Sequence, residues 1–314
     1  MAGATMGTTY HISLVPAANG AWTEAELQIL QREIDGLLKR VNLQMSTYIP
    51  ESELMRFNQA APGEWFIVAP ELMRVLEVSA EVNRSSQGAF DITVAPLVEL
   101  WGFGAREGED QVPAAPSIAQ ALVEVGMDKL ELDKTGLRIR KQGEIRLDLS
   151  AVAKGYGADL VSDFLLDQGF SNTLVEIGGE LRLRGNSQRG TPWKIGVEVP
   201  QLTQGATLKA ISVTNVGVAT SGDYRNYFEV DGKRYSHTLD PRTGYPIEHS
   251  LASVTVVAES AAEADAWATA LSVLGPEQAS TIVEEKKLAV FFIIRTGSGF
   301  EESYSAAFAP YIVD

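Results

Sequence analysis

Two oxygen-bearing side chains late in the sequence are spaced to bind a hard metal ion. Asp265 and Thr269 are four residues apart, so on a helix they share one face. Alanines at many neighbouring positions leave little side-chain bulk around them. Carboxylate and hydroxyl oxygens in such a place suit Mg²⁺ or Ca²⁺ better than Zn²⁺. The alternative is that Asp265 only stabilises the first turns of its helix.

Residues 144–159 bring an acid, a lysine and two glycines into one short stretch. Polar and apolar residues alternate from Glu144 to Leu149, which predicts a half-buried strand with Asp148 on its polar face. We expect Ser150 to cap a helix that ends at Gly169. The unpaired N–H groups at the start of that helix would favour a phosphate or a carboxylate.

Gly155 and Gly157 fall in the first turns of this expected helix. Each costs about 1 kcal/mol relative to alanine in a helix. We therefore expect something to pack closely against the helix start. It is either a ligand or a neighbouring sheet, and in the second case Asp148 and Lys154 are only solvated surface charges.

Asp91 and His237 are two further candidates for a role in a cleft. Asp91 interrupts an apolar run, where it either contacts a ligand or caps the following segment, residues 93–100. His237 stands at the end of an expected strand, just before a turn rich in proline and glycine. That position is well suited to face a cleft, although a lone histidine is more often structural than catalytic.

The composition excludes several functional classes. The chain has 26 Lys and Arg against 41 Asp and Glu, a net charge of −15, which argues against binding nucleic acid or an anionic membrane surface. An anionic substrate would need a metal ion or helix N-termini to offset this charge. With no cysteine, the chain has no disulfide, thiolate metal site or cysteine nucleophile.

The pattern of elements predicts an α+β fold rather than a doubly wound parallel sheet, because antiparallel meanders alternate with separate helices. Capping boxes start two of the helices, one at Thr23 and one at Ser260, and Gly275–Pro276 ends the second. Gly178–Gly179 interrupts a strand region and indicates either a bulge or a close approach to a ligand, with the bulge more frequent. A length of 314 residues fits about two domains or one large unit.

Eight motifs, in this order, resemble the ApbE family of FAD:protein FMN transferases, once called thiamine biosynthesis lipoproteins. They are Thr5–Thr8, Met45–Tyr48, Gly88–Thr93, Asp148–Tyr156, Ile177–Gly179, Thr220–Gly222, His237–Pro241 and Ala264–Thr269. The resemblance implies one ApbE-like flavin transferase domain over residues 1–314, as one unit or as two lobes with a boundary near residues 105–116. It also implies T-fold-like mixed and antiparallel sheets with packed helices and a flavin cleft between the lobes.

In this family FAD is a substrate. A serine or threonine hydroxyl of a target protein attacks the FMN phosphorus, AMP leaves, and FMN stays attached through a phosphoester. By resemblance, the flavin nucleotide contacts Met6, Tyr48, Ala89, Phe90, Asp91, Asp148, Lys154 and the backbone near Leu239. The Mg²⁺ position falls on Asp265, Thr269 and the carbonyl groups of Ala151 and Ala268.

These assignments give each group a physical role. Mg²⁺ on the diphosphate would neutralise charge at the attacked phosphorus and on the leaving AMP. His237 is the candidate base for the hydroxyl proton, since histidine ordinarily titrates near pH 6.5. We expect Met6 and Tyr48 to pack against a ring system rather than perform chemistry.

Two other functions share the same residues. One is a Mg²⁺-dependent FAD pyrophosphatase that releases FMN and AMP, and the other is a flavin-binding protein without catalysis. As the acceptor, the resemblance implies a subunit of a membrane redox complex. It also implies a periplasmic, membrane-anchored lipoprotein whose anchor segment is absent from this sequence, and a cytosolic location is the less favoured alternative.

Overall fold

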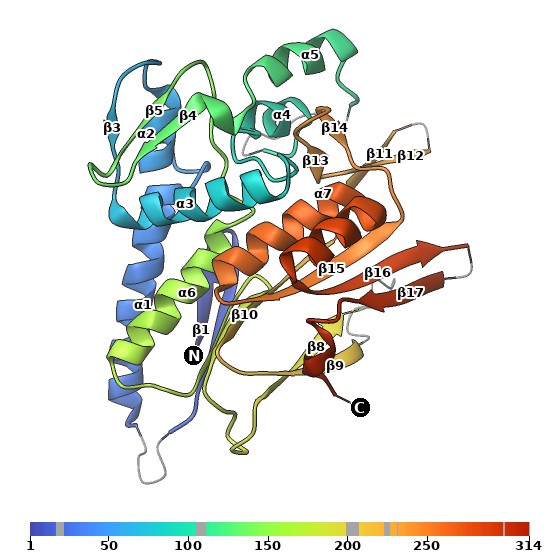
Figure 1. Cartoon of the computed structure of the whole chain (residues 1–314). Coiled ribbons are helices and arrows are strands. Elements are labelled where there is room, and N and C mark those ends of the chain that lie inside the picture. Colours follow the sequence, from blue (N-terminus) through green and yellow to red (C-terminus); the bar gives the residue numbers. More distant parts are fainter. Residues whose placement is uncertain are drawn as a thin grey trace.

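An eight-stranded antiparallel sheet forms the centre of the protein in the computed structural model (Figure 1). The structure describes residues 1–16, 22–104, 111–198, 207–222, 227–230, 232–297 and 299–313. In spatial order, the strands of the sheet are β1 (Ala2–Thr5), β2 (Thr8–Leu14), β6 (Thr173–Ile177), β7 (Glu180–Arg184), β10 (Val216–Gly222), β15 (Leu251–Ala258), β16 (Ala289–Thr296) and β17 (Gly299–Tyr304). The predicted α+β class is confirmed.

Different elements cover the two faces of this sheet. On one face lie α6 (Ala153–Asp167) and α7 (Ala261–Lys286), with α1 (Glu24–Met45) against α6 and α3 (Pro70–Ser85) against α7 (Figure 1). A three-stranded sheet, β18 (Ile312–Val313), β9 (Thr207–Val213) and β8 (Trp193–Glu198), packs on the other. Because strand side chains alternate, Phe292 joins the α7 cluster while its neighbour Phe291 joins the β8–β9 cluster.

The remaining elements form smaller groups beside this core. One group holds α2 (Glu53–Gln59) and a sheet of β3 (Phe66–Ile67), β5 (Arg138–Lys141) and β4 (Leu130–Asp133). The other holds α4 (Ala95–Leu100), α5 (Ala115–Val123) and the hairpins β11 (Tyr227–Val230) with β12 (Lys233–Ser236), and β13 (Leu239–Asp240) with β14 (Tyr245–Pro246). The described residues also form two short 3₁₀ helices, Met127–Lys129 and Ala309–Tyr311. Residues 105–110 of the predicted lobe boundary lie outside the described residues.

Local sequence rules predicted the helix ends well. The Thr23 side chain accepts from the Glu26 N–H at 3.3 Å, and the Glu26 carboxylate accepts from the Thr23 N–H at 2.7 Å, which completes the predicted capping box. The Ser260 side chain caps α7. Gly275, with φ +72°, breaks α7 where the sequence predicted an end.

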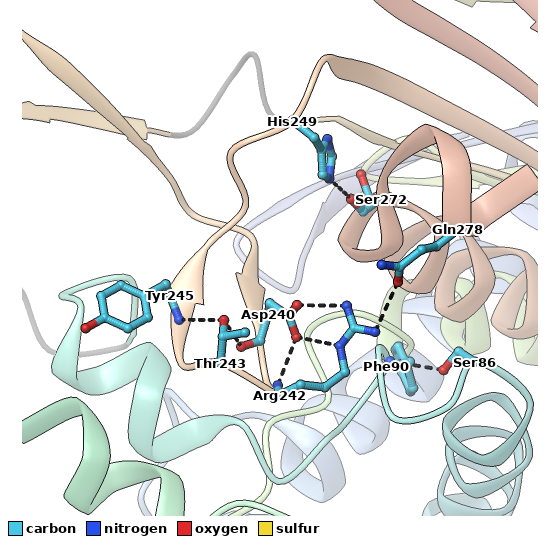
Figure 2. A network of polar contacts seen from close by, with 9 residues as sticks. All are labelled: Ser86, Phe90, Asp240, Arg242, Thr243, Tyr245, His249, Ser272 and Gln278. Carbon is cyan, nitrogen blue, oxygen red and sulfur yellow. Dashed lines mark hydrogen bonds and ion pairs between the residues drawn. The ribbon is translucent and has the colours of Figure 1, made fainter. Parts of the chain in front are cut away.

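The break in α7 is stabilised by His249. Pro276 has no N–H, so the Ser272 carbonyl lacks its usual helical donor. The His249 Nε2 donates to that carbonyl at 2.8 Å (Figure 2). The His249 Nδ1 accepts from the Leu251 N–H at 3.3 Å. In the same view, Arg242 joins the β13–β14 turn to α7 by bonding Asp240 and Gln278.

Three local predictions were wrong. Residues 145–149 alternate in burial as expected but form no sheet strand, because the Asn58 side-chain amide pairs with both the N–H and the carbonyl of Leu147. Ser150 does not cap α6, whose N-cap residue is Val152. The Gly178–Gly179 pair is not a bulge: both glycines have positive φ and form the two-residue turn between β6 and β7.

The close packing expected at Gly155 is a contact between two helices. A Cβ atom on Gly155 would lie 2.3 Å from the Ala261 carbonyl oxygen, so only glycine lets α6 approach the first turn of α7. The Gly155 N–H donates to the Asp265 carboxylate at 3.1 Å. From the next turn of α6, the Asp159 carboxylate accepts from the N–H groups of Ala261 and Ala262, both at 2.9 Å. These contacts fix α7 relative to α6.

We predict that Gly155→Ala lowers the free energy of unfolding by at least about 2 kcal/mol, because the added methyl group forces the two helices apart. Gly36→Ala in α1 is the control, since the nearest atom to its new Cβ is 4.0 Å away. The control should be neutral or stabilising by up to about 1 kcal/mol. Urea unfolding, monitored by circular dichroism, measures the free energy of unfolding of both variants. A Gly155→Ala protein as stable as the parent would contradict the packing argument.

Candidate functional site

A cavity of about 910 Å³ lies where the central sheet, α6, α7 and the β13 region meet. Most of the predicted site residues line it: Tyr48, Ala89, Phe90, Asp91, Asp148, Ala151, Lys154, His237, Leu239, Asp265 and Thr269. They come from segments far apart in the sequence. The cavity is therefore the place where the sequence motifs meet.

Asp265 and Thr269 lie on the side of α7 that faces this cavity, as their spacing predicted. The Asp265 side chain is buried, and this burial raises the pKa of its carboxyl group. The charge of Lys154 and the N–H of Gly155 oppose that rise. The carboxyl group thus lies beside a cavity, with partial compensation of its charge.

Lys154, in the first turn of α6, forms an ion pair with the buried Glu180 at the start of β7. Burial opposes the charge of Lys154, but the charges of Asp265 and Glu180 outweigh burial and raise its pKa. Burial, followed by the charge of Asp265, raises the pKa of Glu180, and the charge and hydrogen bond of Lys154 oppose that rise. Two carboxyl groups therefore compete for one ammonium group.

The start of α6 offers fewer N–H groups to a phosphate than the sequence predicted. The N–H groups of Val152 and Ala153 donate to the Leu149 carbonyl, and that of Gly155 donates to Asp265. The ammonium group of Lys154 is the stronger candidate for contact with an anion on this side of the cavity.

Asp91 is held inside a turn rather than at a helix cap. Its carboxylate accepts from the N–H groups of Thr93 and Met127 at 2.7 and 3.2 Å, while α4 starts later with Val94 as N-cap. Burial raises the pKa of Asp91. Just before it, the Phe90 N–H donates to the Ser86 hydroxyl at 3.1 Å, which fixes the loop that reaches the cavity (Figure 2).

The other predicted flavin contacts differ in how tightly they are held. Tyr48 is 67% exposed, so its ring is available at the cavity edge. Asp148 accepts from the Ser150 N–H at 2.8 Å and is tied to the Asp91 loop through its own N–H, which donates to the Ile92 carbonyl. Leu239 is buried.

His237 follows β12 and faces the cavity, as the sequence predicted. Its ring lies edge-on to Phe103, with the ring centres 6.4 Å apart. Phe103 also stacks on Phe228 at 5.4 Å. The imidazole thus packs beside an aromatic wall.

Two predicted residues do not line the cavity. Met6 occupies the β1–β2 turn with a positive φ of 48°, and its side chain packs near Gly157. Ala268 belongs to α7 and is buried in the core. Their predicted roles stay predictions.

Sequence reasoning missed Glu180 and Phe103, both of which line the cavity. Glu180 follows directly after the Gly178–Gly179 pair, so that pair was the available sign of a special position. Phe103 lies just before the lobe boundary predicted near residues 105–116. Neither role could be inferred without knowing which segments approach α6 and α7.

The donor set suits a hard cation. In the part of the chain that the structure describes, no three His, Cys, Asp or Glu side chains gather into a metal-binding group. Asp265, Thr269 and Ala151 instead line the same cavity, and they carry a carboxylate, a hydroxyl and a backbone carbonyl. Mg²⁺ commonly takes one or two carboxylates and completes its shell with water and substrate phosphates, so these residues fit that ion.

Known proteins resemble this chain over nearly its whole length. The family model described as "ApbE family" matches residues 6–292. A Vibrio cholerae protein named FAD:protein FMN transferase is 42% identical over 312 residues, which cover 99% of this chain and 92% of that protein. The protein of that name from Haemophilus influenzae is 42% identical over 313 residues, which cover 98% of this chain and 90% of that protein.

A solved structure described as the flavin transferase ApbE from Vibrio cholerae superposes with a TM-score of 0.90. It is 41% identical, and the match covers 99% of this chain and 98% of that one. The family match spans nearly the whole chain, and the fold agrees over the same length. The chain is a member of the ApbE family.

Proposed function

We propose that this protein transfers FMN from FAD to a serine or threonine hydroxyl of a target protein, with Mg²⁺ bound and AMP released. Relatives that match nearly the whole chain are named FAD:protein FMN transferase, so this chain is an enzyme that moves FMN from FAD to a protein. The observation that carries the proposal is one cavity that contains Lys154, Asp265, Thr269 and His237.

The bond changes follow from this arrangement. The acceptor oxygen forms a bond to the FMN phosphorus, the bond from that phosphorus to the bridging diphosphate oxygen breaks, and AMP leaves with the electron pair. The imidazole of His237 takes the hydroxyl proton. Lys154 holds the diphosphate by charge, and Asp265 and Thr269 would hold Mg²⁺. The metal, when bound, neutralises charge on the transferred and leaving phosphates.

The acceptor and the cellular location extend the proposal. The acceptor is a subunit of a membrane redox complex, and the enzyme works in the periplasm as an anchored lipoprotein. No helix in the described part of the chain combines the length and the apolar character that a membrane span needs. Fractionating cells that carry the native gene, with an antibody against this protein, tests the location.

We predict that Asp265→Ala abolishes Mg²⁺-dependent labelling of an acceptor peptide, lowering the rate at least about 100-fold, because the metal loses its carboxylate ligand. Mass spectrometry after incubation with FAD measures the gain of one FMN on the peptide. Glu131→Gln, at a surface ion pair of β4, is the control and should label at the parent rate.

Three outcomes contradict this assignment. If the parent releases free FMN and AMP without labelling the peptide, the protein is a pyrophosphatase. If it binds FAD without forming any product, the protein is a flavin carrier. If Asp265→Ala labels as fast as the parent, Asp265 does not bind the catalytic metal.

We predict that His237→Ala lowers the transfer rate about 100-fold at neutral pH while FAD binding changes little, because the acceptor hydroxyl loses its base. His11→Ala is the matched control, since His11 is largely exposed and pairs with Glu176 on the surface. Single-turnover labelling across pH 6–9 measures both variants. A His237→Ala rate equal to the parent rate across this range would exclude His237 as the base.

A further inference from the structure

Glu180 is the cavity residue whose burial and contacts the proposed chemistry does not yet explain. It is the first residue of β7 and is only 4% exposed. One carboxylate oxygen, Oε1, pairs with the Lys154 ammonium group. The other, Oε2, is buried and has no hydrogen-bond partner among the residues that the structure describes. Such a group is costly to bury, so a role beyond filling space is expected.

The β6–β7 turn fixes Glu180 against Lys154. Gly178 and Gly179 have φ values of +59° and +105°, which other residues rarely adopt. A Cβ atom on Gly178 would lie 3.1 Å from the Lys154 Cδ, so the turn packs directly on the lysine stem. The Gly179 N–H donates to Glu176 at 2.6 Å, which holds the turn in place.

Lys154 needs such an anchor. A lysine ammonium is a point charge on a flexible four-carbon stem, so placing it for one geometry costs side-chain entropy. Here the stem lies under the turn and the charge is held by Glu180, while Asp265 contributes a second negative charge nearby. A lysine arranged in this way meets an anionic ligand without further ordering.

We propose that Glu180 is a positioning residue: its buried carboxylate holds the Lys154 ammonium group in the cavity beside Asp265, where that group meets the diphosphate of FAD. The inference rests on the proposed function because it takes the diphosphate as the ligand. The competing explanation is a buried ion pair that only joins β7 to α6. Such pairs are weak evidence for stability in general.

A double-mutant cycle separates the two explanations. The proteins are the parent, Glu180→Gln, Lys154→Met and the double variant, assayed for kcat, for the KM of FAD and for FAD affinity by flavin fluorescence with Mg²⁺ present. If Glu180 acts through Lys154, Glu180→Gln lowers kcat by at least about tenfold in the parent but by less than about threefold when residue 154 is methionine. FAD affinity should show the same non-additivity.

Two further variants sharpen the test. Glu180→Asp keeps the charge one methylene further back and should recover part of the rate. If Glu180→Gln does not fold, Glu180→Asp takes its place in the cycle. The expected loss of kcat is then smaller, and it should again disappear in the Lys154→Met protein. Glu53→Gln is the control, since Glu53 is a buried acid of α2 outside the cavity lining. Its effect should add to that of Lys154→Met.

The outcomes distinguish this inference from the proposed function. The positioning role would be overturned if Glu180→Gln lowered kcat by the same factor with lysine and with methionine at position 154. It would also be overturned if Glu180→Gln lowered the thermal midpoint but left kcat and FAD affinity unchanged. A parent protein that binds FAD but never labels an acceptor would overturn the transferase proposal, and the FAD-affinity cycle would still decide the role of Glu180.

Discussion

The close contact between α6 and the first turn of α7 is the constraint on which the site depends. Gly155 lets the two helices approach, and the Asp159 carboxylate accepts from the first N–H groups of α7. Because of this contact, Lys154 on one helix and Asp265 on the other face the same cavity. If the helices moved apart, the ammonium and carboxyl groups would no longer face one cavity.

Charge is the physical argument for the proposed cation in this cavity. The whole chain carries a net charge of −15, and the cavity itself contains buried acids, so a dinucleotide diphosphate would meet repulsion. One ammonium group shared by Glu180 and Asp265 would not offset both carboxyl groups and a diphosphate. On the proposed function, a divalent cation would supply the remaining positive charge beside the diphosphate. The acidity of the site therefore supports the proposed metal.

Features set by neighbouring residues could be predicted from the sequence, whereas features set by distant ones could not. The Thr23 capping box and the break at Gly275 depend on a few adjacent residues, and both were predicted correctly. The strand expected at residues 145–149 did not form, and the backbone groups of Leu147 bond instead to Asn58, far away in the sequence. The motifs identified Lys154 and Asp265, but Glu180 became visible only once β7 was placed beside α6.

The central claim is that Asp265 and Lys154 bind a metal ion and a diphosphate in one cavity. Mn²⁺ can replace Mg²⁺ at oxygen-rich sites, and its anomalous scattering locates it without ambiguity. A crystal soaked with FAD and Mn²⁺ should show one anomalous peak between the Asp265 carboxylate and the diphosphate, with the Lys154 ammonium group on the same phosphates. A diphosphate bound away from α6 and α7, or a manganese peak that does not contact Asp265, would contradict the account.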